Sequence, residues 1–259
     1  YVTDIANDLE VERISAARER LGHIEAFYAR LKDQMGSVPD GVWPVEDAMV
    51  SVAIGYHSVG EIDTAVQLLS RAQAHKPNLR ALEQLGEISR KRGRYAEAAK
   101  YFGDATHIQL DNALLTHKMH ARLLRMQGEA VAAANQPQQA QRLFRDALGR
   151  WQNLIERHLG PAGGRLDERG RADLSLAFSE RGRLFHQLGE TRHALASFEQ
   201  AVDVDNESAN VYADVIAFLL TRGHYTAALD AYHRALGRDS VEEYYKVYST
   251  LWIVLLARS

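Results

Sequence analysis

The sequence contains no cysteine, only six lysines and no long apolar run. Without cysteine the chain has no disulfide bond, no thiolate nucleophile and no cysteine-ligated metal. The most apolar run, residues 251–257, is far shorter than the ~20 residues that a membrane-spanning helix needs, so we expect no membrane span. The formal net charge of −3 creates no overall positive field, and nucleic acid is therefore not the expected partner.

Sequence motifs of catalysis are also absent. The chain has no HExxH, no phosphate-binding loop, no GxSxG and no dinucleotide-binding fingerprint. His117 and His120 lie on adjacent turns of an expected helix, with Asp111 upstream, but their spacing matches no metal site. We interpret them as solvated or packed histidines. The sequence thus predicts no enzyme, no cofactor and no bound metal.

The sequence does contain a repeated pattern of small and large apolar residues. Five copies place an alanine, a large apolar residue four positions later and a second alanine three positions after that. The first alanines are Ala65, Ala98, Ala140, Ala194 and Ala228, and the large residues are Leu69, Phe102, Phe144, Phe198 and Tyr232. Five positions before the first alanines stand Gly60, Gly93, Asn135, Gly189 and Gly223. Twelve positions before them stand Ala53, Gly86, Gly128, Gly182 and Ile216.

Spacings of three, four and seven lie on one face of a helix, so each copy predicts two amphipathic helices joined by a tight turn. A glycine at the turn can adopt a positive φ and end the first helix. The small residues let the two backbones approach closely beside the large side chain. These features resemble the tetratricopeptide repeat, whose period is about 34 residues. The spacing is 33 from Gly60 to Gly93 and 34 from Gly189 to Gly223.

The resemblance implies an all-α fold, a right-handed superhelix of about five helix-turn-helix repeats. We expect residues 1–44 to form a long N-terminal helix and a turn-rich break, and residues 45–259 to form the repeat array. The apolar residues Ile14, Leu21, Tyr28 and Met35 recur every seven positions. This seam predicts either a coiled coil or a helix that packs back on the first repeat.

The middle copies are longer than the repeat. The spacing is 42 residues from Ala98 to Ala140 and 54 from Ala140 to Ala194, which predicts a lengthened helical hairpin and loop at 113–166. We expect helices from about 113 to 134 and from about 137 to 158. A hairpin that overhangs its neighbours would expose Trp151, Leu154 and Ile155, and this overhang is a candidate contact surface.

The sequence predicts a non-enzymatic module that binds a peptide or protein partner in a groove lined by the first helices. Groove candidates, on the faces that point away from the packing residues, are His57, Arg80, Glu87, Arg90, Arg122, Arg125, Arg183, His186 and Asn210. Surface ion pairs with Glu83, Glu87 and Glu129 are an alternative explanation for these arginines. RNA binding through the arginines is a weaker alternative, because the chain is acidic overall.

The C-terminal segment provides a second candidate surface. A helix from about 241 to 256 is expected to be the first half of a further repeat, with Tyr245, Tyr248, Trp252 and Leu255 on one apolar face. We expect this apolar face to be covered either by residues beyond Ser259 or by a second copy of the chain in a homodimer. The N-terminal heptad helix is the other candidate for a homodimer contact. Tyr1 is no start methionine and no signal peptide follows it, so we expect a piece of a longer protein. The cytoplasm is the expected compartment and the periplasm the alternative.

Overall fold

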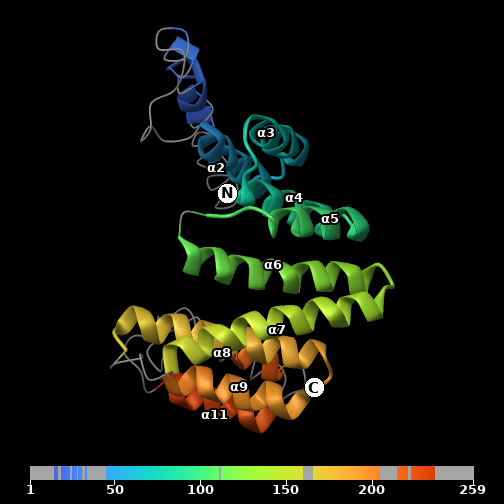
Figure 1. Ribbon diagram of the computed structural model, residues 1–259, viewed down its shortest axis with the longest axis vertical. Coiled ribbons are helices and arrows are strands. Elements are labelled where there is room, and N and C mark those ends of the chain that lie inside the picture. Colours follow the sequence, from blue (N-terminus) through green and yellow to red (C-terminus); the bar gives the residue numbers. More distant parts are fainter. Residues whose placement is uncertain are drawn as a thin grey trace, which may run out of the picture. The chain divides into compact units, whose positions relative to one another are not determined.

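The computed structural model describes residues 15–16, 19–23, 25–27, 29–30, 33, 45–110, 112–159, 166–204, 215–220 and 223–236. Helices joined by short connections make up most of these residues (Figure 1). The chain divides into two compact units, Tyr1–Ala140 (unit 1) and Gln141–Ser259 (unit 2).

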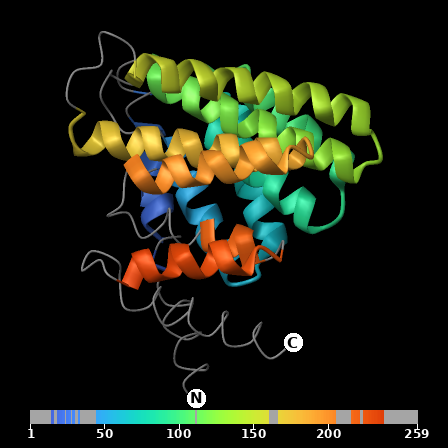
Figure 2. The same cartoon turned by 90° about the horizontal axis from the view of Figure 1, so that it is seen from below.

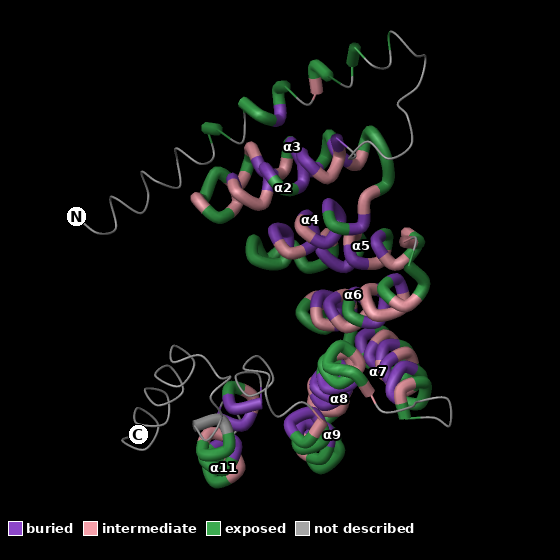
Figure 3. Tube along the Cα trace, turned by 90° about the vertical axis from the view of Figure 1, so that its left-hand side faces the viewer, coloured by how far each residue is buried: buried purple, intermediate pink, exposed green. Residues whose placement is uncertain are grey.

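Unit 1 is built from helices that pair in the order of the sequence. Helix α2 (Val45–Ser58) packs on α3 (Ile62–His75), α4 (Leu79–Lys91) packs on α5 (Tyr95–Ala105), and α6 (Ala113–Ala133) packs on α5. Asparagine side chains cap two of these helices, because Asn78 and Asn112 each accept a hydrogen bond from the backbone N–H three residues later. Buried residues follow the facing sides of the paired helices (Figure 3).

Unit 2 continues the same architecture. Helix α7 (Pro137–Leu159) begins just before the unit boundary and is followed by α8 (Glu168–Gln187) and α9 (Thr191–Val204). Residues 215–220 are helical, and α11 (Tyr225–Leu236) follows them. Helices α8 and α9 lie side by side (Figure 2). The helices expected at 113–134 and 137–158 are confirmed.

The five predicted turns share one backbone geometry. Each of the four turn glycines has a positive φ, from 72° at Gly93 to 86° at Gly60, and Asn135 takes the same conformation with φ 61°. At every turn the next residue donates its N–H to a carbonyl five residues back, as in the Glu61–Tyr56 bond at 2.9 Å and the Gln136–Val131 bond at 3.1 Å. This left-handed cap ends each first helix and satisfies its last carbonyls. The predicted role of the turn residue is confirmed.

The small residues of the repeat permit close helix packing, as predicted. A Cβ built on Gly86 would lie 2.5 Å from the ring of Phe102, and one built on Gly182 would lie 2.9 Å from the ring of Phe198. Both rings are almost fully buried. The first alanines are buried in all five copies, namely Ala65, Ala98, Ala140, Ala194 and Ala228.

The described part of the N-terminal segment packs on the first repeat. Leu21 is buried in one apolar cluster with residues of α2 and α3, and Glu25 forms a 2.6 Å ion pair with Arg71 of α3. At Leu21 the structure therefore agrees with the second alternative for the heptad seam, in which the helix packs back on the first repeat. The other seam positions, Ile14, Tyr28 and Met35, lie outside the described residues.

The expected overhang of the long hairpin is wrong. Trp151, Leu154 and Ile155 are each no more than 3% exposed. Helix α8 is also long, with 20 residues, and it contacts α7 beside Trp151. A hydrogen bond of 3.1 Å from Arg181 of α8 to Gln152 of α7 marks this contact. These three residues are buried and are no contact surface.

Candidate functional site

The first helices of unit 1 carry most of the predicted groove residues. These are His57 on α2, Arg80, Glu87 and Arg90 on α4, and Arg122 and Arg125 on α6. Together with two carboxylates they form what we call the charged face of unit 1, defined as His57, Glu83, Glu87, Arg90, Arg122, Arg125 and Glu129. Arg80 is exposed near the start of α4 and is not part of this set.

An ion pair joins α4 to α6 within the charged face. Arg122 Nη2 lies 2.8 Å from Glu83 Oε1, and the Glu83 side chain is only 10% exposed whereas that of Arg122 is 47% exposed. A carboxylate that is largely removed from water needs such a partner, because an unpaired buried charge costs more than an unpaired neutral polar group. Arg122 therefore has a structural role in addition to its exposed position.

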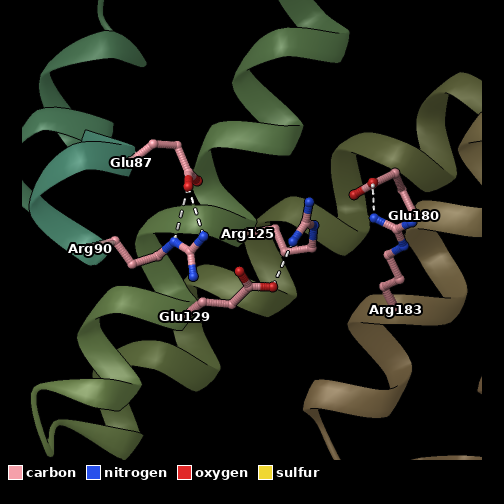
Figure 4. A network of polar contacts seen from close by, with 6 residues as sticks. All are labelled: Glu87, Arg90, Arg125, Glu129, Glu180 and Arg183. Atoms are coloured by element: carbon pink, nitrogen blue, oxygen red, sulfur yellow. Dashed lines mark hydrogen bonds and ion pairs between the residues drawn. The ribbon is translucent and has the colours of Figure 1, made fainter. Parts of the chain in front are cut away.

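Two further pairs lie within single helices (Figure 4). On α4, Nε and Nη2 of Arg90 donate to the same oxygen of Glu87 at 3.2 and 2.7 Å. On α6, Arg125 Nη1 lies 2.6 Å from Glu129 Oε1, and the Arg125 side chain is mostly buried. The carboxylate of Glu87 and the more distant charge of Glu129 raise the pKa of Arg90, against a smaller opposing effect of burial. The ion pairs named as an alternative explanation for the arginines are confirmed for Glu83, Glu87 and Glu129.

His57 lies where α2 meets the charges of α4. Partial burial lowers the pKa of His57 below its ordinary value of 6.5, the positive charge of Lys91 lowers it further, and Glu87 opposes both with a smaller effect. We therefore expect His57 to be neutral at physiological pH. In this form its ring carries one donor and one acceptor.

Arg122→Ala is expected to lower the free energy of unfolding by about 1 kcal/mol, because it leaves the Glu83 carboxylate largely buried without its cation. Urea denaturation followed by circular dichroism measures this change. Glu83→Gln in the same chain removes the charge and should restore most of the loss. Equal stabilities of the parent and Arg122→Ala would show that water solvates the Glu83 carboxylate and that the Arg122–Glu83 ion pair does not stabilise the contact of α4 with α6.

The position of His57 also predicts a pH dependence. The unfolded chain binds a proton at His57 near pH 6.5, whereas the folded chain binds it only at lower pH, so stability is lost as the pH falls from 6.5 through the folded pKa. Urea unfolding at about pH 7.5 and about pH 5 should show a smaller loss for His57→Asn than for the parent chain, since the other histidines are common to both. Identical losses would contradict the assignment.

Unit 2 carries a similar arrangement on α8. Arg183 Nη1 lies 3.4 Å from Glu180 Oε1, and the Glu180 side chain is 7% exposed (Figure 4). The ring of His186 meets that of Phe218 edge-on at 4.9 Å. The predicted groove residue Asn210 and the predicted C-terminal surface of Tyr245, Tyr248, Trp252 and Leu255 lie outside the described residues.

His120, which the sequence raised as a possible metal ligand, is packed inside the protein. His120 is buried, and its Nε2 lies 2.7 Å from the carbonyl oxygen of Ile108. In the part of the chain that the structure describes, no three His, Asp or Glu side chains gather closely enough to hold a metal ion. No helix in the same part combines the length and the apolarity that a membrane crossing requires.

One polar residue that sequence reasoning missed is Arg181. Its guanidinium lies where α7, α8 and α9 meet, with hydrogen bonds to Gln152, Ser197 and Gln200. The signal was present in the sequence, because Arg181 precedes Gly182, which packs against α9. The residue before Gly182 therefore lies beside the contact of α8 with α9.

Two family models match the chain. Residues 57–108 match the tetratricopeptide repeat, and residues 118–242 match the bacterial transcriptional activator domain. The crystal structure of a thermophilic tetratricopeptide-repeat protein of Thermus thermophilus is similar, with a TM-score of 0.51, 18% identity, and coverage of 81% of this chain and 99% of that one.

The chain thus contains tetratricopeptide-like repeats, as the sequence predicted, and the family's model matches residues 57–108. Its fold is the all-α fold of tandem helix-turn-helix repeats that the sequence predicted.

Other solved structures of such repeats are more distant. PilF of Pseudomonas aeruginosa has 18% identity and a TM-score of 0.46, covering 82% of this chain and 83% of that one. YrrB, described as a tetratricopeptide-repeat protein with an unusual peptide-binding site, has 15% identity and a TM-score of 0.40, covering 86% and 97%. No curated protein matches the chain significantly. Tetratricopeptide-repeat proteins are in general non-catalytic scaffolds whose partners are proteins or peptides.

Proposed function

We propose that this tetratricopeptide-repeat chain is the protein-binding module of a bacterial transcriptional regulator. The observation that carries the proposal is the position of the two family matches. A segment similar to the bacterial transcriptional activator domain follows, along the chain, a segment similar to the tetratricopeptide repeat. A non-catalytic scaffold within a regulator acts by binding another protein, and the charged face of unit 1 is the surface proposed for that contact.

The pairing of charges on this face defines the partner it suits. Arg90 and Arg122 each have a carboxylate partner, yet their side chains remain 42% and 47% exposed. Because each of the three arginines on this face is paired with a glutamate, the face has little net field. It suits a protein segment that presents both signs of charge in a matching order, since complementary charges fix the register and exclude wrong partners. The same pairing makes nucleic acid a weaker candidate.

Self-assembly remains the alternative that the sequence raised. Within the described residues, Leu21 of the N-terminal heptads packs inside unit 1, which leaves that side chain unavailable for a coiled coil. Self-assembly through the expected C-terminal helix stays a prediction.

Exchange of the two charges of the Glu87–Arg90 pair tests the proposal. In the variant Glu87→Arg/Arg90→Glu an i,i+3 ion pair is still available, so the melting temperature should stay close to that of the parent chain. The order of the charges is reversed, however, and a partner that recognises this order should no longer bind. The immobilised parent chain and the variant are incubated with lysate of the source organism, and the bound proteins are quantified by mass spectrometry.

The matched control is the exchange Arg94→Glu/Glu97→Arg. Arg94 and Glu97 have the same i,i+3 spacing, with Arg94 Nη1 3.6 Å from Glu97 Oε2, at the start of α5. The proposal expects at least one protein that is captured by the parent and the control but lost, by about 10-fold or more, from the charged-face variant. Capture that is equal for all three chains would exclude the charged face as the binding surface.

A further inference from the structure

Arg181 of α8 is held by three neutral groups from two other helices. Its Nε donates to Ser197 Oγ at 3.0 Å, its Nη1 donates to Gln152 Oε1 at 3.1 Å, and its Nη2 donates to Gln200 Oε1. The guanidinium also lies over the ring of Phe178, 4.8 Å from the ring centroid. The group is therefore fixed in place by α7, α9 and its own helix.

No carboxylate within the described ranges pairs with this guanidinium, which distinguishes Arg181 from Arg90, Arg122 and Arg183 on the same set of helices. Arg90, Arg122 and Arg183 each have a glutamate partner. Burial alone lowers the pKa of Arg181. Partly buried charges in proteins are ordinarily paired with an opposite charge.

The geometry leaves donors for such a charge. A guanidinium has five N–H groups in a fixed fork, and the three bonds above use one N–H on each nitrogen, so one N–H on Nη1 and one on Nη2 have no acceptor among the described residues. Two N–H groups on adjacent nitrogens of a planar fork match the two oxygens of a carboxylate. Because three acceptors already fix the fork, little side-chain entropy remains to be lost on binding.

We propose that Arg181 is a carboxylate-binding point, at which an aspartate or glutamate side chain of the partner protein docks where α7, α8 and α9 meet. This inference rests on the proposed function, since it supplies a second contact for the same kind of partner. It shares no residue with the charged face, because its residues belong to unit 2.

A carboxylate fits the site better than a phosphate. Gln152, which accepts from Arg181, donates its own Nε2 to Glu156 Oε1 at 3.1 Å. A negative charge is therefore one side chain away from the fork. A singly charged carboxylate balances the single charge of Arg181, whereas a doubly charged phosphate leaves an excess negative charge and is repelled more strongly by Glu156.

Nuclear magnetic resonance tests the assignment on the whole chain. The side-chain Nε–H signal of Arg181 is followed while an acetylated, amidated hexaglutamate peptide is added at constant ionic strength. The matched probes are the hexaglutamine peptide and inorganic phosphate. We expect a saturable shift of the Arg181 signal with hexaglutamate and none with hexaglutamine. No shift with hexaglutamate, or saturation by phosphate alone, would overturn the proposal and leave Arg181 as a tie between helices.

Two variants distinguish the effect of the paired N–H donors of Arg181 from the effect of positive charge alone. Arg181→Lys keeps the positive charge but loses the paired donors, and should weaken the affinity for hexaglutamate about 10-fold. Arg192→Gln removes an exposed arginine from α9 and should leave that affinity within about 2-fold. Equal weakening by both variants would mean that hexaglutamate senses only net charge, and would overturn the proposal. Because the probe reports on Arg181 itself, its failure is distinct from a failure of the lysate experiment.

Discussion

Trp151→Ala is expected to lower the free energy of unfolding by about 3–5 kcal/mol, the range for a large aromatic side chain removed from a core. The indole is 1% exposed in α7, so the substitution removes its buried apolar area and leaves a cavity. Chemical denaturation with intrinsic fluorescence from the other tryptophans and with circular dichroism measures the change. Loss of the folded state at 37 °C is consistent with this magnitude, because whole domains are stable by only about 5–15 kcal/mol.

The matched control lies on the same helix. Leu159 is the last residue of α7 and is 61% exposed, so Leu159→Ala should change stability by no more than about 0.5 kcal/mol. If the Trp151→Ala variant were as stable as the Leu159→Ala variant, Trp151 would be exposed on an overhanging hairpin. This result would contradict its burial in α7.

Gly86→Ala is expected to destabilise the chain by about 2 kcal/mol, although alanine is the better helix former. The new Cβ would lie 2.5–2.8 Å from three ring atoms of Phe102, which is itself fully buried. Such overpacking typically costs about 1–3 kcal/mol, and the close contact suggests the upper end of that range. The gain in helix propensity offsets about 1 kcal/mol of it.

A double-mutant cycle identifies the ring as the cause. Phe102→Leu removes the ring atoms that the new Cβ would meet, so Gly86→Ala should cost at least about 1 kcal/mol less in the Phe102→Leu background. The control is Gly149→Ala, because a Cβ at this exposed helical glycine meets nothing within 4 Å. It should be neutral or stabilise by up to about 1 kcal/mol. Additive effects in the cycle would contradict the proposed wedge of Phe102 between the helices.

The repeat was readable from the sequence because its requirements are local. A turn that must adopt a positive φ selects glycine or asparagine, and the sequence shows this at Asn135 as clearly as at Gly93. The close approach of paired helices likewise selects a small residue such as Gly86 opposite a large one. Both constraints act within one repeat, and their spacing in the chain is fixed.

The errors and omissions concern contacts between repeats. The burial of Trp151 depends on side chains outside its own helix, which the pattern within one repeat does not specify. The pairing of Arg122 with Glu83 was an open alternative, because residues 39 positions apart in the sequence meet only if α4 and α6 have the right offset. Arg181 was missed because its acceptors, Gln152 and Gln200, carry no charge that would mark them as partners.

The proposed function requires that the order of charges on the charged face of unit 1 selects a protein partner. Its most direct test is isothermal titration calorimetry of the partner identified by capture against three chains: the parent, Glu87→Arg/Arg90→Glu and the control Arg94→Glu/Glu97→Arg. We expect a dissociation constant at least about 10-fold larger for the charged-face variant, equivalent to about 1.4 kcal/mol, and one within about 2-fold of the parent for the control. Equal dissociation constants for all three chains, with unchanged melting temperatures, would contradict it.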